Sequence, residues 1–93
     1  MYSVYILASR RNGTLYIGVT NSLRTRLEQH RSGEGSEFVK QYGVYRLVYV
    51  ENYERPDEAI AREKQLKRWK RDWKIRLIER DNLDWSDLSR LVE

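Results

Sequence analysis

Five side chains in this 93-residue sequence have types that suit chemistry: Tyr5, Tyr16, Arg26, His30 and Glu63. Phenol and imidazole groups can transfer protons, a guanidinium binds anions, and an isolated carboxylate binds cations. Whether these groups act together depends on the strands and helices that carry them, so the local sequence around each is considered in turn.

Tyr5 and Tyr16 lie in two apolar, β-rich runs, residues 4–8 and 15–19, on either side of Asn12-Gly13. Asn-Gly is a strong signal for a two-residue hairpin turn. That turn predicts three opposed pairs, which are Tyr5 with Thr20, Leu7 with Gly18, and Ser9 with Tyr16. Because side chains alternate between faces along a strand, both tyrosines and Gly18 then share one face, and the other face is aliphatic.

Arg26 and His30 lie one turn apart on a helix expected from Ser22, its N-cap, to Gly33. Both residues border the buried leucine stripe of this helix. Two interpretations are open. Either Arg26 extends its stem over apolar surface and His30 is a hydrogen-bonded packing residue, or the pair belongs to a functional site.

Glu63 lies in a second helix, which Pro56 opens, after a nearly continuous apolar run at residues 45–50 that predicts a third, buried strand. Helical spacing puts Glu63 in one stripe with Ala59, Ile60, Leu66 and Lys67. A buried, unpaired carboxylate is costly, so Glu63 requires a cation. That cation is either Lys67, as an i,i+4 pair, or a divalent metal such as Mg²⁺.

From Lys64 to Arg76, seven of thirteen residues are basic and one is acidic. Trp69, Trp73 and Leu77 recur every four residues in this run, and the spacing predicts that the tryptophans form a core stripe and not a base-stacking platform. The cations have no such internal explanation. Since a solvated helix usually intersperses both signs, this run predicts a phosphate-contacting surface.

The composition indicates one domain over residues 1–93 with a modest core. The order strand, strand, helix, strand, helix, helix predicts an α+β fold with a three-stranded, mainly antiparallel sheet, and residues 85–92 are expected to form a last amphipathic helix that packs as a lid. Without cysteine and with one histidine, a metal would be a hard cation on oxygen ligands. The absence of a signal peptide or membrane span predicts a cytoplasmic protein, and a net charge of +4 favours polyanionic partners.

Several of these segments together resemble one family. Ser3-Val4-Tyr5 and Tyr16-Ile17-Gly18 look like the paired signature of GIY-YIG nuclease domains, with Ser3 and Val4 in place of the first Gly and Ile. The Arg26-x-x-x-His30 pair is similar to that of the family, and Glu63 resembles its metal-binding glutamate. Val19 and Ile75 depart from residues that many relatives carry, a lysine and an asparagine.

The resemblance implies a metal-dependent endonuclease that hydrolyses DNA phosphodiester bonds with Mg²⁺ or Mn²⁺. By resemblance, Tyr5 activates water or relays its proton, His30 tunes Tyr5, Tyr16 orients the phosphate, Arg26 clamps it and Glu63 holds the metal. The candidate nucleic-acid contacts are Gly18, Arg24, Lys64, Lys67, Arg68, Lys70, Arg71 and Lys74. A partner protein or a second copy of the chain is expected to supply specificity.

Two other functions remain as alternatives. One is an inactive or weakly active nuclease-like module that binds nucleic acid through the basic run, and the other is an adaptor that contacts another protein. Salt-sensitive binding without metal-dependent cleavage would select the first, and the absence of nucleic-acid affinity at low salt would select the second.

Overall fold

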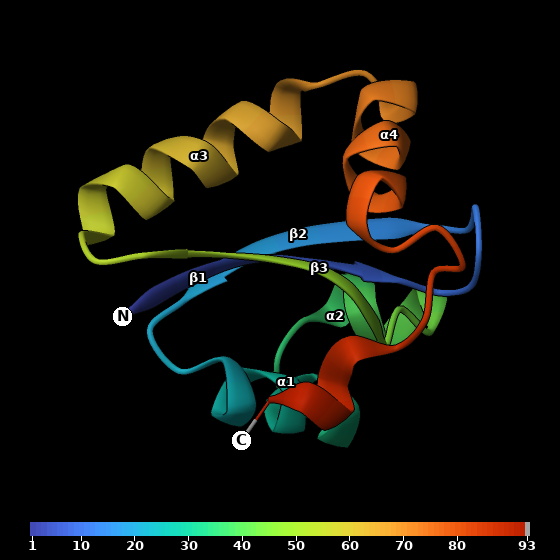
Figure 1. The fold of residues 1–93 in the computed structure, drawn as a ribbon. Coiled ribbons are helices and arrows are strands. Elements are labelled where there is room, and N and C mark those ends of the chain that lie inside the picture. Colours follow the sequence, from blue (N-terminus) through green and yellow to red (C-terminus); the bar gives the residue numbers. More distant parts are fainter. Residues whose placement is uncertain (93) are drawn as a thin grey trace.

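The computed structural model describes residues 1–92 and has one antiparallel sheet with helices on both faces (Figure 1). The central strand β1 (Tyr2–Ala8) pairs with β2 (Leu15–Thr20) on one side and β3 (Arg46–Tyr53) on the other. The predicted α+β class, the three-stranded sheet and the order of its first elements are confirmed. Both β2 and β3 are edge strands, and each borders a different cluster of polar side chains.

The helices divide between the two faces of the sheet. Below it in Figure 1 lie α1 (Leu23–Ser32), α2 (Glu37–Tyr42) and the 3₁₀ helix η1 (Leu88–Leu91), while α3 (Pro56–Arg68) and α4 (Arg71–Asp81) lie above it. Gly33 and Gly43 end α1 and α2 with positive φ angles of 84° and 63°. None of the helices in residues 1–92 is long and apolar enough to cross a membrane.

The period-two pattern of the hairpin gives each face its own core. Val4, Ile6, Ala8 and Ile17 pack beneath α3 and α4, and the opposite face of β1 packs Tyr5 and Leu7 against the other layer. Apolar burial is worth about 25 cal/mol per Å², so a register that exchanged the two faces would expose the aliphatic set and is strongly disfavoured. The predicted shared face of the two tyrosines is therefore present.

The predicted hairpin register is wrong by two residues. Tyr5 lies opposite Gly18, and Leu7 lies opposite Tyr16. Arg10 to Gly13 form a four-residue loop, closed by a Ser9 N–H to Thr14 carbonyl bond of 3.0 Å, in which Asn12 has φ 58°. A shift of two keeps every side chain on its face, which is why the facial assignment survives.

Three details of the helices also differ from expectation. The basic run is not one helix, because Trp69 and Lys70 adopt extended backbone angles between α3 and α4. Trp73, predicted on a buried stripe, lies beyond this corner and is 47% exposed. Ile60 is 43% exposed because it lies about 100° around α3 from the buried Ala59. The predicted last helix is only a short 3₁₀ turn, although Leu88 and Val92 do pack against the sheet as a lid.

Candidate active site

The site begins with Tyr5 and Gly18, which face each other across β1 and β2. Tyr5 is fully buried, and its ring crosses the position that a Cβ on residue 18 would occupy, only 2.4 Å from the Tyr5 hydroxyl oxygen. Glycine is thus required opposite Tyr5 for steric reasons. The ring of Tyr16 lies 6.4 Å from that of Tyr5, measured between centroids.

His30 reaches the same place from α1. Its Nε2 lies 2.9 Å from the Tyr5 hydroxyl, and its ring stands edge-on to Tyr16 at 5.3 Å. Only 1% of His30 is exposed, and its Nδ1 has no hydrogen-bond partner among residues 1–92. Burial and the nearby Arg26 charge lower the pKa of His30, so the imidazole is neutral near pH 7.

Arg26 completes the cluster one turn earlier on α1. Its Nη1 donates to Gln29 Oε1 at 3.1 Å and its Nη2 donates to the Gly35 carbonyl at 3.3 Å, both neutral acceptors. Burial raises the pKa of Tyr5 to about 12, although the adjacent Arg26 guanidinium acts in the opposite direction. Tyr5 is consequently a neutral phenol at physiological pH, and Arg26 keeps a positive charge without a carboxylate partner among residues 1–92.

Gly35 is a site residue that the sequence reasoning missed. Besides accepting from Arg26, it lies against the imidazole, where an added Cβ would be 2.7 Å from His30 Nδ1. The local sequence of Gly33-Glu34-Gly35 indicates a loop and nothing more. Two glycines directly after a helix with candidate site residues were the available signal, because a close backbone approach is one reason for glycine.

Glu63 lies on α3, whose residues contact both β1 and β2, and its charge contributes to the raised pKa of Tyr5. Its side chain is 13% exposed, and Oε2 is 2.6 Å from Lys67 Nζ. The i,i+4 pair is therefore formed. No group of three or more potential metal ligands exists in residues 1–92. One carboxylate still suits Mg²⁺, which typically keeps waters and substrate phosphate oxygens as its other ligands.

A groove of about 280 Å³ lies along the open edge of β2, and Tyr16 is the member of the Tyr5 cluster in its lining. Arg26 instead lines a separate hollow beside Thr20 and Ser22. Its lining includes Tyr16, Phe38 from α2, Lys67 from α3 and Lys74 from α4, and it contains no acidic residue. Burial and the nearby Arg71 charge lower the pKa of Lys74. An anion in this groove would meet two ammonium groups beside the Tyr16 ring, which is the electrostatic arrangement that attracts a phosphate.

The other predicted nucleic-acid contacts are not all beside this groove. Arg71 donates to the carbonyls of Asn12 and Gly13 at 2.7 and 2.5 Å, so it ties α4 to the hairpin loop. Arg24 pairs with Glu28 at 3.6 Å on the exposed side of α1. Arg68 lines a different hollow, near Tyr53, while Lys64 and Lys70 are exposed. The predicted cations therefore lie on both faces of the sheet and do not form a single surface (Figure 1).

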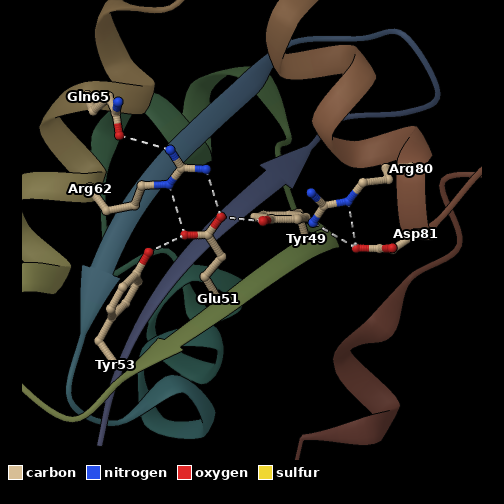
Figure 2. Close-up of polar contacts among 7 residues, drawn as sticks. All are labelled: Tyr49, Glu51, Tyr53, Arg62, Gln65, Arg80 and Asp81. Carbon is tan, nitrogen blue, oxygen red and sulfur yellow. Dashed lines mark hydrogen bonds and ion pairs between the residues drawn. The ribbon is translucent and has the colours of Figure 1, made fainter.

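A second polar cluster lies at the β3 edge, and the sequence reasoning missed it too (Figure 2). Glu51 accepts four hydrogen bonds, from the hydroxyls of Tyr49 and Tyr53 and from Nε and Nη2 of Arg62, the last two at 3.0 Å each. Burial alone would raise the pKa of Glu51, but these bonds bring it below its ordinary value. The predicted strand ended at residue 50, before the Tyr-x-Glu-x-Tyr spacing on one strand face became visible.

The fold and the site together define a class. The protein is a small α+β domain in which a hairpin glycine, two tyrosines, an arginine and a histidine converge at one sheet edge. The GIY-YIG catalytic domain matches residues 1–76, and the chain belongs to the GIY-YIG family.

The similar proteins have UPF0213 names, which state no biochemical activity. UPF0213 proteins from Staphylococcus aureus strains Mu3 and N315 are each 38% identical to this chain over 76 residues, which is 82% of this chain and 92% of theirs. The solution NMR structure of the UPF0213 protein BH0048 from Bacillus halodurans aligns with a TM-score of 0.58 and 28% identity. The alignment covers 98% of this chain and 97% of that one.

Proposed function

We propose that this protein is a metal-dependent endonuclease that hydrolyses DNA phosphodiester bonds at the Tyr5 site. The convergence of Tyr5, His30 and Arg26 carries the proposal. It places a phenol in contact with a neutral imidazole, beside a guanidinium that donates to two neutral oxygens and pairs with no carboxylate in the described part of the chain. Membership of the GIY-YIG family supports a nuclease. Of the two alternatives, the binding module keeps support from the exposed cations.

The side chains divide the reaction between them. Water attacks phosphorus and loses a proton to the Tyr5 oxygen, while the Tyr5 proton moves to Nε2 of His30, 2.9 Å away. The bond from phosphorus to the leaving oxygen then breaks, and the leaving alkoxide takes a proton from solvent water. Arg26 binds the non-bridging oxygens as negative charge develops, and Tyr16 orients the phosphate at the groove. The low pKa of His30 keeps Nε2 free to accept a proton at neutral pH.

Glu63 would hold a Mg²⁺ or Mn²⁺ ion, with waters and phosphate oxygens as its remaining ligands. When bound, the ion supplies charge neutralisation at the phosphate and lowers the pKa of coordinated water. Lys67, now paired with Glu63, would then be released toward the groove that it already lines.

The test is a cleavage assay on linear, nicked, flapped and branched DNA with Mg²⁺, Mn²⁺ or EDTA, comparing wild type with Tyr5→Phe and Glu63→Gln. We expect Tyr5→Phe to lose about 10³-fold in cleavage rate, because removing a proton-transfer group typically costs 10²- to 10⁴-fold. Tyr2→Phe is the matched control, since Tyr2 lies on the same strand but packs on the opposite face.

Glu63→Gln separates the metal ligand from the ion pair. If Glu63 holds the metal, the variant should stay folded and bind DNA without metal, yet lose cleavage. If Glu63 serves only Lys67, stability should fall and the cleavage loss should track the unfolded fraction. Full cleavage by folded Glu63→Gln, or by folded Tyr5→Phe, would overturn the proposed assignment.

A further inference from the structure

A second groove, of about 290 Å³, lies at the corner between α3 and α4, apart from the candidate active site. Its lining residues are Trp69, Trp73, Arg76, Leu77 and Arg80. None of them belongs to the Tyr5 cluster or to the β2 groove. The lining combines two aromatic rings and a leucine with two arginines, and these five residues include no acid. Such a surface is unusual for a solvated helix. It suits a ligand that has both apolar faces and negative charge.

The aromatic floor of the groove is held in place by the β3 cluster. Arg62, fixed by its two bonds to Glu51 in Figure 2, stacks over the Trp69 ring at 5.0 Å. Trp69 in turn meets Trp73 edge-on, with centroids 5.9 Å apart and planes at 85°. Trp69 is partly buried, whereas Trp73 is 47% exposed. The structure thus presents one exposed aromatic ring on a fixed support.

The charges around this ring match a polyanion. Arg76 is exposed at the groove, and Arg80, which also lines it, pairs with the exposed Asp81 at 3.2 Å. A base stacked on Trp73 would leave its phosphates within the field of these arginines. Base stacking on aromatic side chains combined with a basic rim is how proteins hold single strands. Bases inside a duplex are already stacked on one another and cannot use such a ring.

We propose that the Trp73 groove binds an unpaired segment of a DNA strand. This inference rests on the proposed function for its ligand class, and it adds the expectation that the preferred substrates carry single-stranded segments such as flaps. Trp73 supplies stacking, and Arg76 and Arg80 supply phosphate contacts. Trp69, locked beneath Arg62, keeps the ring of Trp73 oriented.

Binding of a short single-stranded DNA oligonucleotide, followed by anisotropy and tryptophan fluorescence, tests the proposal. An abasic oligonucleotide of equal length is the charge-matched probe. Wild type should prefer the oligonucleotide with bases, and Trp73→Ala should lose about tenfold in affinity and also lose that preference. Trp73→Phe keeps an aromatic face, so it should retain most affinity but lose most of the fluorescence change. Leu83→Ala, an exposed apolar residue outside the groove, is the control.

The arginines provide a second, independent measurement. Arg76→Gln and Arg80→Gln should each flatten the salt dependence by about 0.7 in log Kd against log salt, the value for one phosphate contact on a single strand. Unchanged affinity and base preference in Trp73→Ala would overturn the proposal. So would a Trp73→Ala protein that binds single strands normally but loses a dimer, since the groove would then join two copies.

The outcomes also separate this inference from the proposed function. Cleavage of duplex DNA that depends on Tyr5, without Trp73-dependent binding of single strands, would retain the nuclease and reject the groove. Trp73-dependent binding by a protein that cleaves no DNA would retain the groove and reject the nuclease.

Discussion

The two edges of the sheet carry nearly the same side chains but differ in how their charges are balanced. At the β2 edge, two tyrosines and an arginine meet His30, and at the β3 edge two tyrosines and an arginine meet Glu51. In the second cluster, both Glu51 oxygens accept two bonds each, which uses all of the acceptor sites of a carboxylate. In the first, His30 Nδ1 lacks a partner within residues 1–92 and Arg26 binds only neutral oxygens.

This difference distinguishes a saturated cluster from one with remaining capacity for a ligand more clearly than residue types do. The β3 cluster is electrically neutral and saturated, so it has nothing to offer a ligand and instead joins α3 to the sheet. The β2 cluster carries one uncompensated positive charge in a partly buried place, and an anion would lower its energy. Matched substitutions in the two clusters test this contrast directly.

The largest contrast is expected from the same substitution at both arginines. Arg26→Gln should reduce DNA cleavage about 10² to 10³-fold, as expected for one donor to developing charge, with little change in thermal stability. Arg62→Gln leaves the Glu51 carboxylate, 17% exposed, without its cation, and should destabilise the fold by about 2 kcal/mol. For a domain of this size, that predicts a fall in melting temperature of roughly 8 to 16 °C.

Both variants need both measurements. Cleavage by Arg62→Gln, corrected for the folded fraction, should equal that of wild type on a fully duplex substrate. If Arg62→Gln kept its melting temperature but lost duplex cleavage, the β3 cluster would be functional and the contrast would fail.

An intermediate effect is expected at Gly35, which belongs to the β2 cluster only through its backbone. Gly35→Ala places a Cβ 2.7 Å from His30 Nδ1, so the imidazole must shift away from Tyr5. We expect cleavage to fall about 10 to 100-fold, a typical cost of misplacing a group by about 1 Å. Glu34→Ala, at the exposed neighbouring position, is the control. Equal activity of the two variants would show that Gly35 does not position His30.

The smallest expected effect concerns how the free energy of unfolding, measured with urea, depends on pH. We expect two separate pH ranges in which stability falls, one for each cluster. The pKa of His30 is lowered on folding, so its contribution is complete above the unfolded value of 6.5 and is lost as the pH falls below it. The pKa of Glu51 is also lowered, so its contribution is complete above 4.5 and is lost as the pH falls further. His30→Gln should remove only the first dependence and Glu51→Gln only the second. A single shared window would contradict independent clusters.

The periodicity of the sequence correctly predicted which side chains share a face of a strand or a helix. The alternation in β1 and β2 placed Tyr5, Tyr16 and Gly18 on one face, and the i,i+4 spacing placed Arg26 and His30 on one border of α1. The hairpin register was predicted wrongly, because a shift of two residues leaves every side chain on the same face of the sheet. Gly18 was the better guide, since only a residue without Cβ fits beneath the Tyr5 ring.

The contacts that the sequence did not reveal are those between distant segments. The break at Trp69 and Lys70 turns Trp73 outward, but each residue is individually compatible with a helix. The sequence around Arg62 does not identify its partner, since its bond to Glu51 spans eleven residues and two elements. Such pairings depend on how α3 crosses the sheet, which no local pattern specifies.

The position of Tyr5 on the central strand has a consequence for regulation. β1 is hydrogen-bonded on both sides and covered on both faces, so the Tyr5 hydroxyl cannot be displaced without disrupting the sheet. Tyr5 is therefore positioned in every folded molecule, and the conformational entropy lost in positioning it is lost during folding and not during substrate binding. Control over such a protein would then act on what reaches the β2 edge, or on how long the protein persists.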